Sequence, residues 1–367
     1  MIKIFRANRV YSGLLSDIYR KHPEAADMDF EKQMNWFYDF CINESRYWKD
    51  YLVASGQFQI MEVITNASHL QTRWAQSRKL HTSNPDEILM AQIEEFRPDV
   101  IYDNTRSNFT PAVRKQLKKK YPGLKFIAWD GLPVGSIDYF EGTDLLFSYL
   151  PYLAAKYEAR GIKTAQIPFG FEPGVLSKIP AYTQRYSTTF IGSIEYNIHA
   201  KRIQFLKSIQ KNYPIDMWVG KLNLKKVLLG MKQLRFKEII SSLGLKAKSH
   251  GSLFGLDYYK ILQASDITLN IQEHEGAGNI RYVEATGCGT CLLTDWKPDI
   301  LDYYTPDSEI VTYKTMDEAI DKIKYLLQHE TERKKIALAG QQKTFQHFNM
   351  KSRALKFGQA INQLVSN

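Results

Sequence analysis

Apolar runs of strand length alternate with segments of helical period along most of the chain. Residues 2–5, 58–64 and 267–271 are short and mainly apolar, which is typical of buried parallel strands, and residues 187–192 are expected to form a further strand. Residues 85–96 instead place Ile88, Leu89 and Ile93 on one helical face, with Asn84 as the expected N-cap and Pro85 as the first helical residue. This alternation predicts an α/β fold with parallel sheets.

Two further helical segments follow from the same pattern. Residues 30–55 read as one long helical region dense in aromatic residues, which we expect to pack in the core rather than to form a stacking platform. Residues 110–120 predict a basic helix with Pro111 at its first position.

The segment 265–295 has the pattern of a strand, a loop, a helix and a second strand. Ile267–Ile271 suits a buried strand, Gly276 and Gly278 open a loop, and residues 280–286 make a short helix. The loop therefore lies at the carboxyl end of a parallel strand and at a helix N-terminus, where α/β proteins bind phosphate groups. Arg281 and Glu284 share one face of this helix, where Arg281 can pair with a phosphate and Glu284 can accept ribose hydroxyls.

Length and charge narrow the class of protein. A chain of 367 residues suits two domains, and its net charge of +10 with a pI near 9.2 favours an anionic partner such as a nucleotide or an anionic membrane. Residues 114–120 and 221–248 are locally basic, and no RNA-binding signature accompanies them, so we expect no nucleic acid partner. Without a signal peptide or a long apolar stretch, the expected location is cytoplasmic, with peripheral contact at the inner membrane face.

Cys288 and Cys291 have the spacing of a redox or metal motif. Zinc would need two further ligands, and the sequence offers no second cysteine pair, so we favour buried thiols beside a glycine turn. The chain also lacks a nucleophile elbow, a phosphate-binding P-loop and a HExxH zinc motif.

The run from Gly278 to Thr290 resembles the nucleotide-sugar site of the CgeB-like glycosyltransferases of the GT-B superfamily. It is also similar to the signature with two glutamates in group 1 retaining glycosyltransferases. That signature has seven residues between its glutamates, whereas Glu275 and Glu284 have eight between them, so the correspondence is carried by Glu284.

The resemblance implies a GT-B fold, with two Rossmann-like domains facing an interdomain cleft. Residues 1–168 would form the acceptor-side domain, residues 169–345 the nucleotide-sugar-binding domain, and residues 346–367 a helix that returns to the first domain. The implied activity is transfer of a sugar from a nucleotide-sugar donor to a glycan, lipid-linked or protein acceptor, without a metal ion or a further cofactor. The alternatives are a non-catalytic nucleotide-sugar-binding scaffold and a nucleotide-sugar epimerase of the same fold.

Site residues follow from the resemblance and from their places at strand ends. The expected donor-binding residues are Gly192, Ser193, Arg202, His250, Gly278, Asn279, Arg281 and Glu284. Arg202 has a phosphate-binding or a structural role. The reacting centre stays open: Asp103 or Asp130 could act as the base of an inverting enzyme, and Glu275 or Glu273 could serve a retaining one, with His274 compatible with either.

Overall fold

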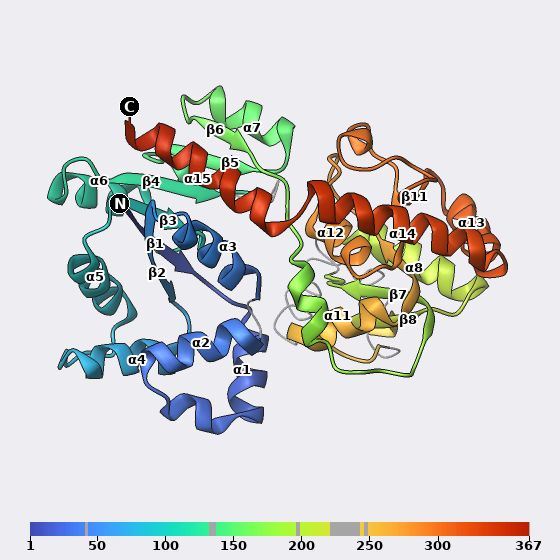
Figure 1. The fold of residues 1–367 in the computed structure, drawn as a ribbon, viewed down its shortest axis with the longest axis horizontal. Coiled ribbons are helices and arrows are strands. Elements are labelled where there is room, and N and C mark those ends of the chain that lie inside the picture. The colour runs from blue at the N-terminus through green and yellow to red at the C-terminus, as the bar shows by residue number, and fades with distance from the viewer. Residues whose placement is uncertain (41–42, 132–136, 196–198, 221–242, 246–248, 367) are drawn as a thin grey trace, which may run out of the picture. The chain divides into compact units, whose positions relative to one another are not determined.

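The computed structural model describes residues 1–40, 43–131, 137–195, 199–220, 243–245 and 249–366. The chain divides into two compact units, which are described separately below (Figure 1). Unit 1 consists of Met1–Pro168 and Met350–Asn367, and unit 2 consists of Phe169–Asn349.

Unit 1 is built on a parallel sheet of six strands in the order β2-β1-β3-β4-β5-β6. The strands are β1 (Ile2–Asn8), β2 (Phe58–Ile64), β3 (Val100–Asp103), β4 (Lys125–Trp129), β5 (Leu145–Ser148) and β6 (Thr164–Gln166). Because all six run the same way, the residues that follow their carboxyl ends gather along one edge of the sheet. Asp103 and Asp130 stand at this edge, at the ends of β3 and β4.

Helices cover the sheet of unit 1. They are α1 (Ser12–Lys21), α2 (Phe30–Phe40), α3 (Asn43–Ala54), α4 (Ser68–Ser77), α5 (Pro85–Phe96), α6 (Pro111–Lys120), α7 (Pro151–Glu158) and α15 (Met350–Ser366), with short 3₁₀ turns at η1 (Pro23–Asp27) and η2 (Ile137–Phe140). The last helix, α15, packs on α3, and Phe357 from α15 stacks on Phe147 of β5 in the core. Of the aromatic residues in 30–55, Phe30, Phe37, Tyr38 and Trp48 are buried, and Trp48 contacts Phe357 edge-on, whereas Trp36, Tyr47 and Tyr51 are half-buried.

Local signals in the sequence account for two of these helices. The side chain of Asn84 accepts a hydrogen bond from the amide of Asp86 at 2.9 Å, and Pro85 begins α5, which confirms the predicted cap. Thr110 caps α6 in the same way, with Pro111 as its first residue. The region 30–55 is helical as predicted, in α2 and α3, which lie on either side of residues 41–42 outside the described ranges.

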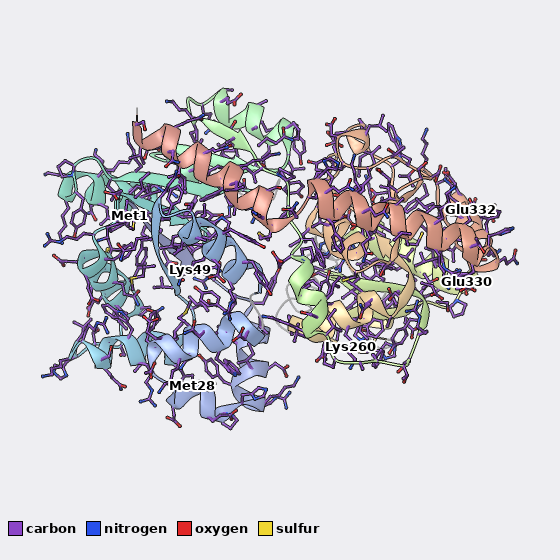
Figure 2. All side chains as sticks on the ribbon, in the orientation of Figure 1. Met1, Met28, Lys49, Lys260, Glu330 and Glu332 are labelled. Atoms are coloured by element: carbon purple, nitrogen blue, oxygen red, sulfur yellow. The ribbon has the colours of Figure 1, made fainter. Side chains whose placement is uncertain are left out.

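Unit 2 holds a second parallel sheet, of five strands in the order β11-β10-β9-β7-β8. The strands are β7 (Tyr186–Gly192), β8 (Asp216–Val219), β9 (Ser265–Asn270), β10 (Cys291–Asp295) and β11 (Val311–Tyr313). The helices are α8 (Ala200–Asn212), α11 (Gly255–Gln263), α12 (Ile280–Gly287), α13 (Met316–Gln328) and α14 (Glu330–His347), with 3₁₀ turns at η3 (Pro173–Lys178) and η4 (Ile300–Asp302). The labelled Glu330 and Glu332 mark the start of α14 in Figure 2.

Side chains of alternate residues in these strands point to opposite faces, and each face has its own core. Phe190, Leu269 and Leu293 pack in one core with α8 and α13. Ile191, Trp218 and Leu292 pack in the other with α11 and α12. Both faces are therefore buried, as the continuous apolar character of the strands predicts.

The structure describes one of the two predicted basic segments and almost none of the other. In residues 114–120, Arg114 is buried against Asp103, Lys118 pairs with Asp144, and Lys120 pairs with Glu94. Three of the five basic side chains in this segment therefore have acidic partners within unit 1. The other segment, residues 221–248, lies outside the described residues except for 243–245. Among the helices of the described ranges, none is long and apolar enough to cross a membrane.

Candidate functional site

The loop between β9 and α12 has the predicted geometry. β9 ends at Asn270, and α12 begins at Ile280, so the loop lies at a strand's carboxyl end and a helix N-terminus. The side chain of Asn279 caps the helix by accepting from the amide of Arg281 at 3.1 Å, and it donates to Asn270 at 3.2 Å. The Asn279 side chain thus caps α12 and joins it to β9. This is a structural role, whereas the sequence predicts donor binding for this residue.

Gly278 has a conformation that only glycine adopts easily, with φ of +80°. A Cβ atom there would also collide with the ring of Tyr303, which is 5% exposed. The backbone conformation and the packing against Tyr303 are therefore sufficient reasons for a glycine at position 278, with or without a ligand.

Arg281 is directed from the first turn of α12 toward the end of β7. Its Nη2 donates to the backbone oxygen of Ile191 at 2.6 Å, whereas its Nη1, which is buried, has no hydrogen-bond partner among the described residues. Burial lowers the pKa of Arg281 from its ordinary value, and Glu284 partly offsets this effect. A buried cation with an unused donor at a helix N-terminus is suited to an anionic ligand.

Glu284 lies one turn further along α12, on the same face as Arg281, as the sequence predicts. Its Oε2 is 3.9 Å from Nη1 of Arg281, which is an ion-pair distance without a hydrogen bond. The hydroxyl of Tyr258, from α11, donates to the same Oε2, and the Tyr258 ring lies 4.8 Å from the guanidinium carbon of Arg281. Both side chains are mostly buried, with exposed fractions of 14% and 13%.

The turn after β7 contributes Gly192 and Ser193 at the same sheet edge, next to Ile191. Arg202, from the start of α8, donates through Nη1 to the Ser193 oxygen at 2.8 Å and through Nε and Nη2 to the Ile271 oxygen. Burial lowers the pKa of Arg202, and the negative charge of Glu273 acts against that shift. Of the two roles open for Arg202, these contacts favour the structural one, because the side chain joins the loops after β7 and β9.

His250 does not lie with Arg281 and Glu284. Its Nε2 is 3.0 Å from Asp216, the first residue of β8, and its ring packs 4.7 Å from the ring of Trp218. Asp216 pairs in register with Thr189, whereas Val219 pairs with Gly192. His250 is therefore at the amino end of β8, away from the sheet edge that carries the other donor-site candidates.

The three candidates Glu273, His274 and Glu275 occupy the loop after β9. Glu275 is exposed, whereas Glu273 accepts a hydrogen bond from the amide of Arg202 at 3.0 Å. Burial, with the charge of Lys297 as a second cause, lowers the pKa of His274, which keeps its ring neutral at pH 7. Lys297 donates to the His274 backbone oxygen at 2.6 Å and pairs with Asp295 at 2.8 Å.

Asp103 in unit 1 belongs to a closed network. Its Oδ2 is 2.9 Å from Nη2 of Arg114 and accepts from Tyr139 at 2.8 Å, while its Oδ1 accepts from Thr105 at 2.7 Å. The side chains of Asp103 and Arg114 are 1% and 0% exposed. These contacts engage both oxygens of the carboxylate, so the network favours a structural role over the expected one.

Asp130 has a similar environment. Its Oδ2 accepts a hydrogen bond from Tyr157 and lies 3.4 Å from Arg106, with 1% of its side chain exposed. Burial and the contact with Asp130 raise the pKa of Tyr157 above its ordinary value, so Tyr157 remains a hydrogen-bond donor. These contacts favour a structural role for Asp130 over the expected role as a catalytic base.

Cys288 and Cys291 are both buried free thiols. Burial raises the pKa of Cys288 well above its ordinary value and that of Cys291 to about 12. Neither thiol has the thiolate character that redox chemistry needs. No group of three or more metal-ligating side chains occurs within the part of the chain that the structure describes.

Residues 202–359 match a family model described as glycosyl transferase-like. This part of the chain carries a glycosyl transferase-like domain. The matched range contains the β9–α12 loop with Arg281 and Glu284, and it begins at Arg202. No curated protein matches the chain in sequence.

Solved structures extend the likeness to the whole chain at the level of fold. They include sucrose-phosphate synthase from Thermosynechococcus elongatus, with TM-score 0.63, 12% identity and 100% of both chains covered. HepE from Anabaena in complex with UDP and glucose has TM-score 0.61 at 12% identity, with 99% of this chain and 100% of that chain covered. AviGT4, a glycosyltransferase involved in avilamycin A biosynthesis, has TM-score 0.59 at 12% identity, with 100% and 98% covered. The fold is that of the GT-B glycosyltransferases, with two Rossmann-like units.

Sequence reasoning missed two residues of this site. Tyr258 and Lys297 are distant in sequence from the loop that they contact, and no motif marks either one. Tyr258 reaches the site because α11 packs beside α12, and only the tertiary structure shows that packing. In Figure 2 the position of α11 is marked by the label on Lys260, which follows Tyr258 by two residues in the same helix.

Proposed function

We propose that this protein is a glycosyltransferase, of the CgeB-like branch, that moves a sugar from a nucleotide diphosphate sugar to a glycan, lipid-linked or protein acceptor. The observation that carries the proposal is the pair formed by Arg281 and Glu284. The two side chains lie on one face at the mouth of α12, 3.9 Å apart, inside the glycosyl transferase-like domain. HepE, a protein of similar fold, has been crystallised with UDP-glucose.

The diphosphate of the donor would bind at the N-terminus of α12. Backbone amides in the first turn of a helix carry partial positive charge and lack partners within the helix. Arg281 adds a full charge and an unused Nη1 donor at the same place. As the bond from the sugar to the diphosphate breaks, negative charge grows on the departing phosphate. We propose that these groups stabilise that charge in place of a metal ion.

The ribose of the donor would bind to Glu284. An ionised carboxylate has two oxygens with about four acceptor positions, which is the chemistry that recognises two adjacent hydroxyls, and Tyr258 donates to Oε2 of this one. Arg281 would then contact the diphosphate and Glu284 the ribose of one nucleotide. Because the two side chains are one helical turn apart, a ligand that carries both groups would bind best.

The transfer step needs a hydroxyl oxygen of the acceptor to attack the anomeric carbon while the carbon–oxygen bond to the diphosphate breaks. Of the four carboxylates considered for this step, Asp103 and Asp130 are buried in ion pairs, and Glu273 accepts a hydrogen bond from the amide of Arg202. Glu275 alone is exposed, and it lies on the loop that leads to the diphosphate site. We therefore propose Glu275 as the carboxylate that faces the sugar ring or the incoming hydroxyl.

A binding and turnover experiment tests the proposal. Isothermal titration calorimetry with a panel of ribonucleoside diphosphates should detect a ligand, and incubation with the matching nucleotide sugars should release free sugar slowly without an acceptor. Arg281→Met should weaken binding of the diphosphate by about tenfold to a hundredfold, as expected for a charge-assisted contact. Arg185→Met is the matched control, because Arg185 pairs with Asp266 at the amino end of β9.

Three results distinguish the candidate functions. Release of free sugar or transfer to an acceptor supports the transferase. Binding without any turnover supports a nucleotide-sugar-binding scaffold. Conversion of the sugar to its epimer, detected by NMR, supports an epimerase; a putative UDP-N-acetylglucosamine 2-epimerase from Listeria monocytogenes has a similar fold, with TM-score 0.50 at 12% identity over 98% of this chain and 95% of that chain. Absence of binding by every diphosphate at millimolar concentration would refute the donor site.

A further inference from the structure

Tyr258 contacts both members of the Arg281–Glu284 pair from a different helix. It lies in the first turns of α11, and its hydroxyl donates a hydrogen bond to Oε2 of Glu284. Its ring lies under the guanidinium of Arg281, 4.8 Å from Cζ. Because α11 and α12 pack side by side on one face of the sheet, this single residue can constrain both side chains.

The hydrogen bond to Glu284 limits where the carboxylate can point. A glutamate side chain on an exposed helix face has three rotatable bonds and samples many conformations. Here the phenol hydroxyl holds Oε2, and a hydrogen bond to a charged acceptor is among the stronger ones in proteins. The carboxylate is therefore oriented before a ligand arrives, and binding does not have to order it.

The position of Arg281 depends on the same tyrosine. Arginine and glutamate three residues apart on a helix are close enough to form a direct pair. In this structure Nη1 and Oε2 remain 3.9 Å apart, because Tyr258 already donates to Oε2 while Arg281 donates to Ile191 at 2.6 Å. The Tyr258 ring supports the guanidinium in this position through a cation–π contact. Arg281 thus keeps a donor available for another acceptor.

We propose that Tyr258 is a positioning residue of the donor site, which keeps Glu284 oriented toward the two ribose hydroxyls and keeps Arg281 apart from it for the diphosphate. The inference rests on the proposed function and deepens it. It makes recognition of the ribose depend on Tyr258, because an oriented carboxylate at this place distinguishes a ribose from a sugar without its 2′- and 3′-hydroxyls. A tyrosine that only packed α11 against α12 would affect stability and would not affect this discrimination.

The test compares two probes, uridine diphosphate and 2′,3′-dideoxyuridine diphosphate, by calorimetry. The dissociation constant of the dideoxy compound reports on the diphosphate contact alone, and the ratio of the two constants reports on ribose recognition. Tyr258→Phe keeps the ring and removes the hydroxyl. We expect its affinity for uridine diphosphate to fall by about tenfold, the usual effect of one hydrogen bond to a charged group, while the dideoxy compound changes by less than about twofold. Tyr258→Leu also removes the ring and should weaken both probes.

Tyr325→Phe is the matched control. Tyr325, in the same unit, also donates to a glutamate, Glu332, at 2.8 Å, but at an exposed surface on α13. Its substitution should leave both dissociation constants unchanged. An unchanged ratio in Tyr258→Phe, or an equal loss for both probes, would overturn the role of Tyr258 while leaving the proposed function standing. A wild-type ratio near one would remove the ribose role of Glu284 and this inference with it. Failure of the wild-type chain to bind either probe, together with every other ribonucleoside diphosphate of the panel, counts against the donor site itself.

Discussion

Replacement of Gly278 by alanine tests whether the entry to α12 needs this backbone conformation. Gly278 has φ of +80°, and an added Cβ would overlap the ring of Tyr303; even the third-nearest ring atom, Cε2, would lie 2.8 Å away. Tyr303 is buried, and its ring stacks 5.9 Å from the ring of Phe348, so it cannot move aside easily. The loop must therefore shift, together with the cap of α12.

The magnitude has two parts. A left-handed conformation costs a residue with a side chain about 1–2 kcal/mol. Forcing an extra carbon against a packed ring costs about 1–3 kcal/mol more. We expect Gly278→Ala to lower the free energy of unfolding by about 2–5 kcal/mol, which is a large part of the stability of a typical domain.

Gly251 provides the matched control in the same unit. It has φ of +95°, but a Cβ there would meet no atom of the described residues within 4 Å, so Gly251→Ala should cost only the backbone part, about 1–2 kcal/mol. Urea unfolding followed by circular dichroism measures both variants, and hydrogen exchange can localise the change to α12. If Gly278→Ala is no less stable than Gly251→Ala, the packing against Tyr303 does not constrain the loop and this reasoning is wrong.

Three further outcomes follow from individual contacts. Arg114→Met should destabilise unit 1 by about 3–5 kcal/mol in urea unfolding, since it leaves Asp103 buried without its cation, and adding Asp103→Asn should restore part of the loss. Asn279→Ala should lower the free energy of unfolding by about 1 kcal/mol, because it removes the cap of α12. A loss of less than about 0.3 kcal/mol would contradict that role. His274 has a pKa lowered below 6.5 by burial, so the unfolded state binds the proton more readily and stability should fall as pH drops below about 6.5. His274→Gln should reduce this fall between about pH 7.5 and 5.5, and an identical pH profile would show that another group causes it.

Local patterns were sufficient for much of the fold. The sequence predicted α5 with its Asn84 cap and Pro85 start because capping depends on residues that are neighbours in the chain. It also predicted the strand Phe58–Ile64 and the helix that carries Arg281, for which the hydrophobic period is clear. It did not predict β6, because three residues of mixed polarity form a strand only by pairing with β5.

The roles of charged residues were harder to predict. Asp103 and Asp130 stand at strand ends, as expected, yet each lies in an ion pair with an arginine from another part of unit 1, Arg114 and Arg106 respectively. A carboxylate at the end of a strand has the same sequence pattern whether it faces a ligand or a buried guanidinium. Arg202 illustrates the same limit, because its partners are backbone oxygens, which every residue possesses.

The sequence by itself determined the alternation of strands and helices and the placing of Arg281 and Glu284 on one face of α12, since these properties depend on spacing along the chain. Only the tertiary structure decided what surrounds that pair. Tyr258 reaches it because α11 and α12 pack on the same face of the sheet, and Ile191 reaches it because β7 lies next to β9. Contacts between elements depend on how the sheet is assembled, and residue spacing within one element carries no record of its neighbours.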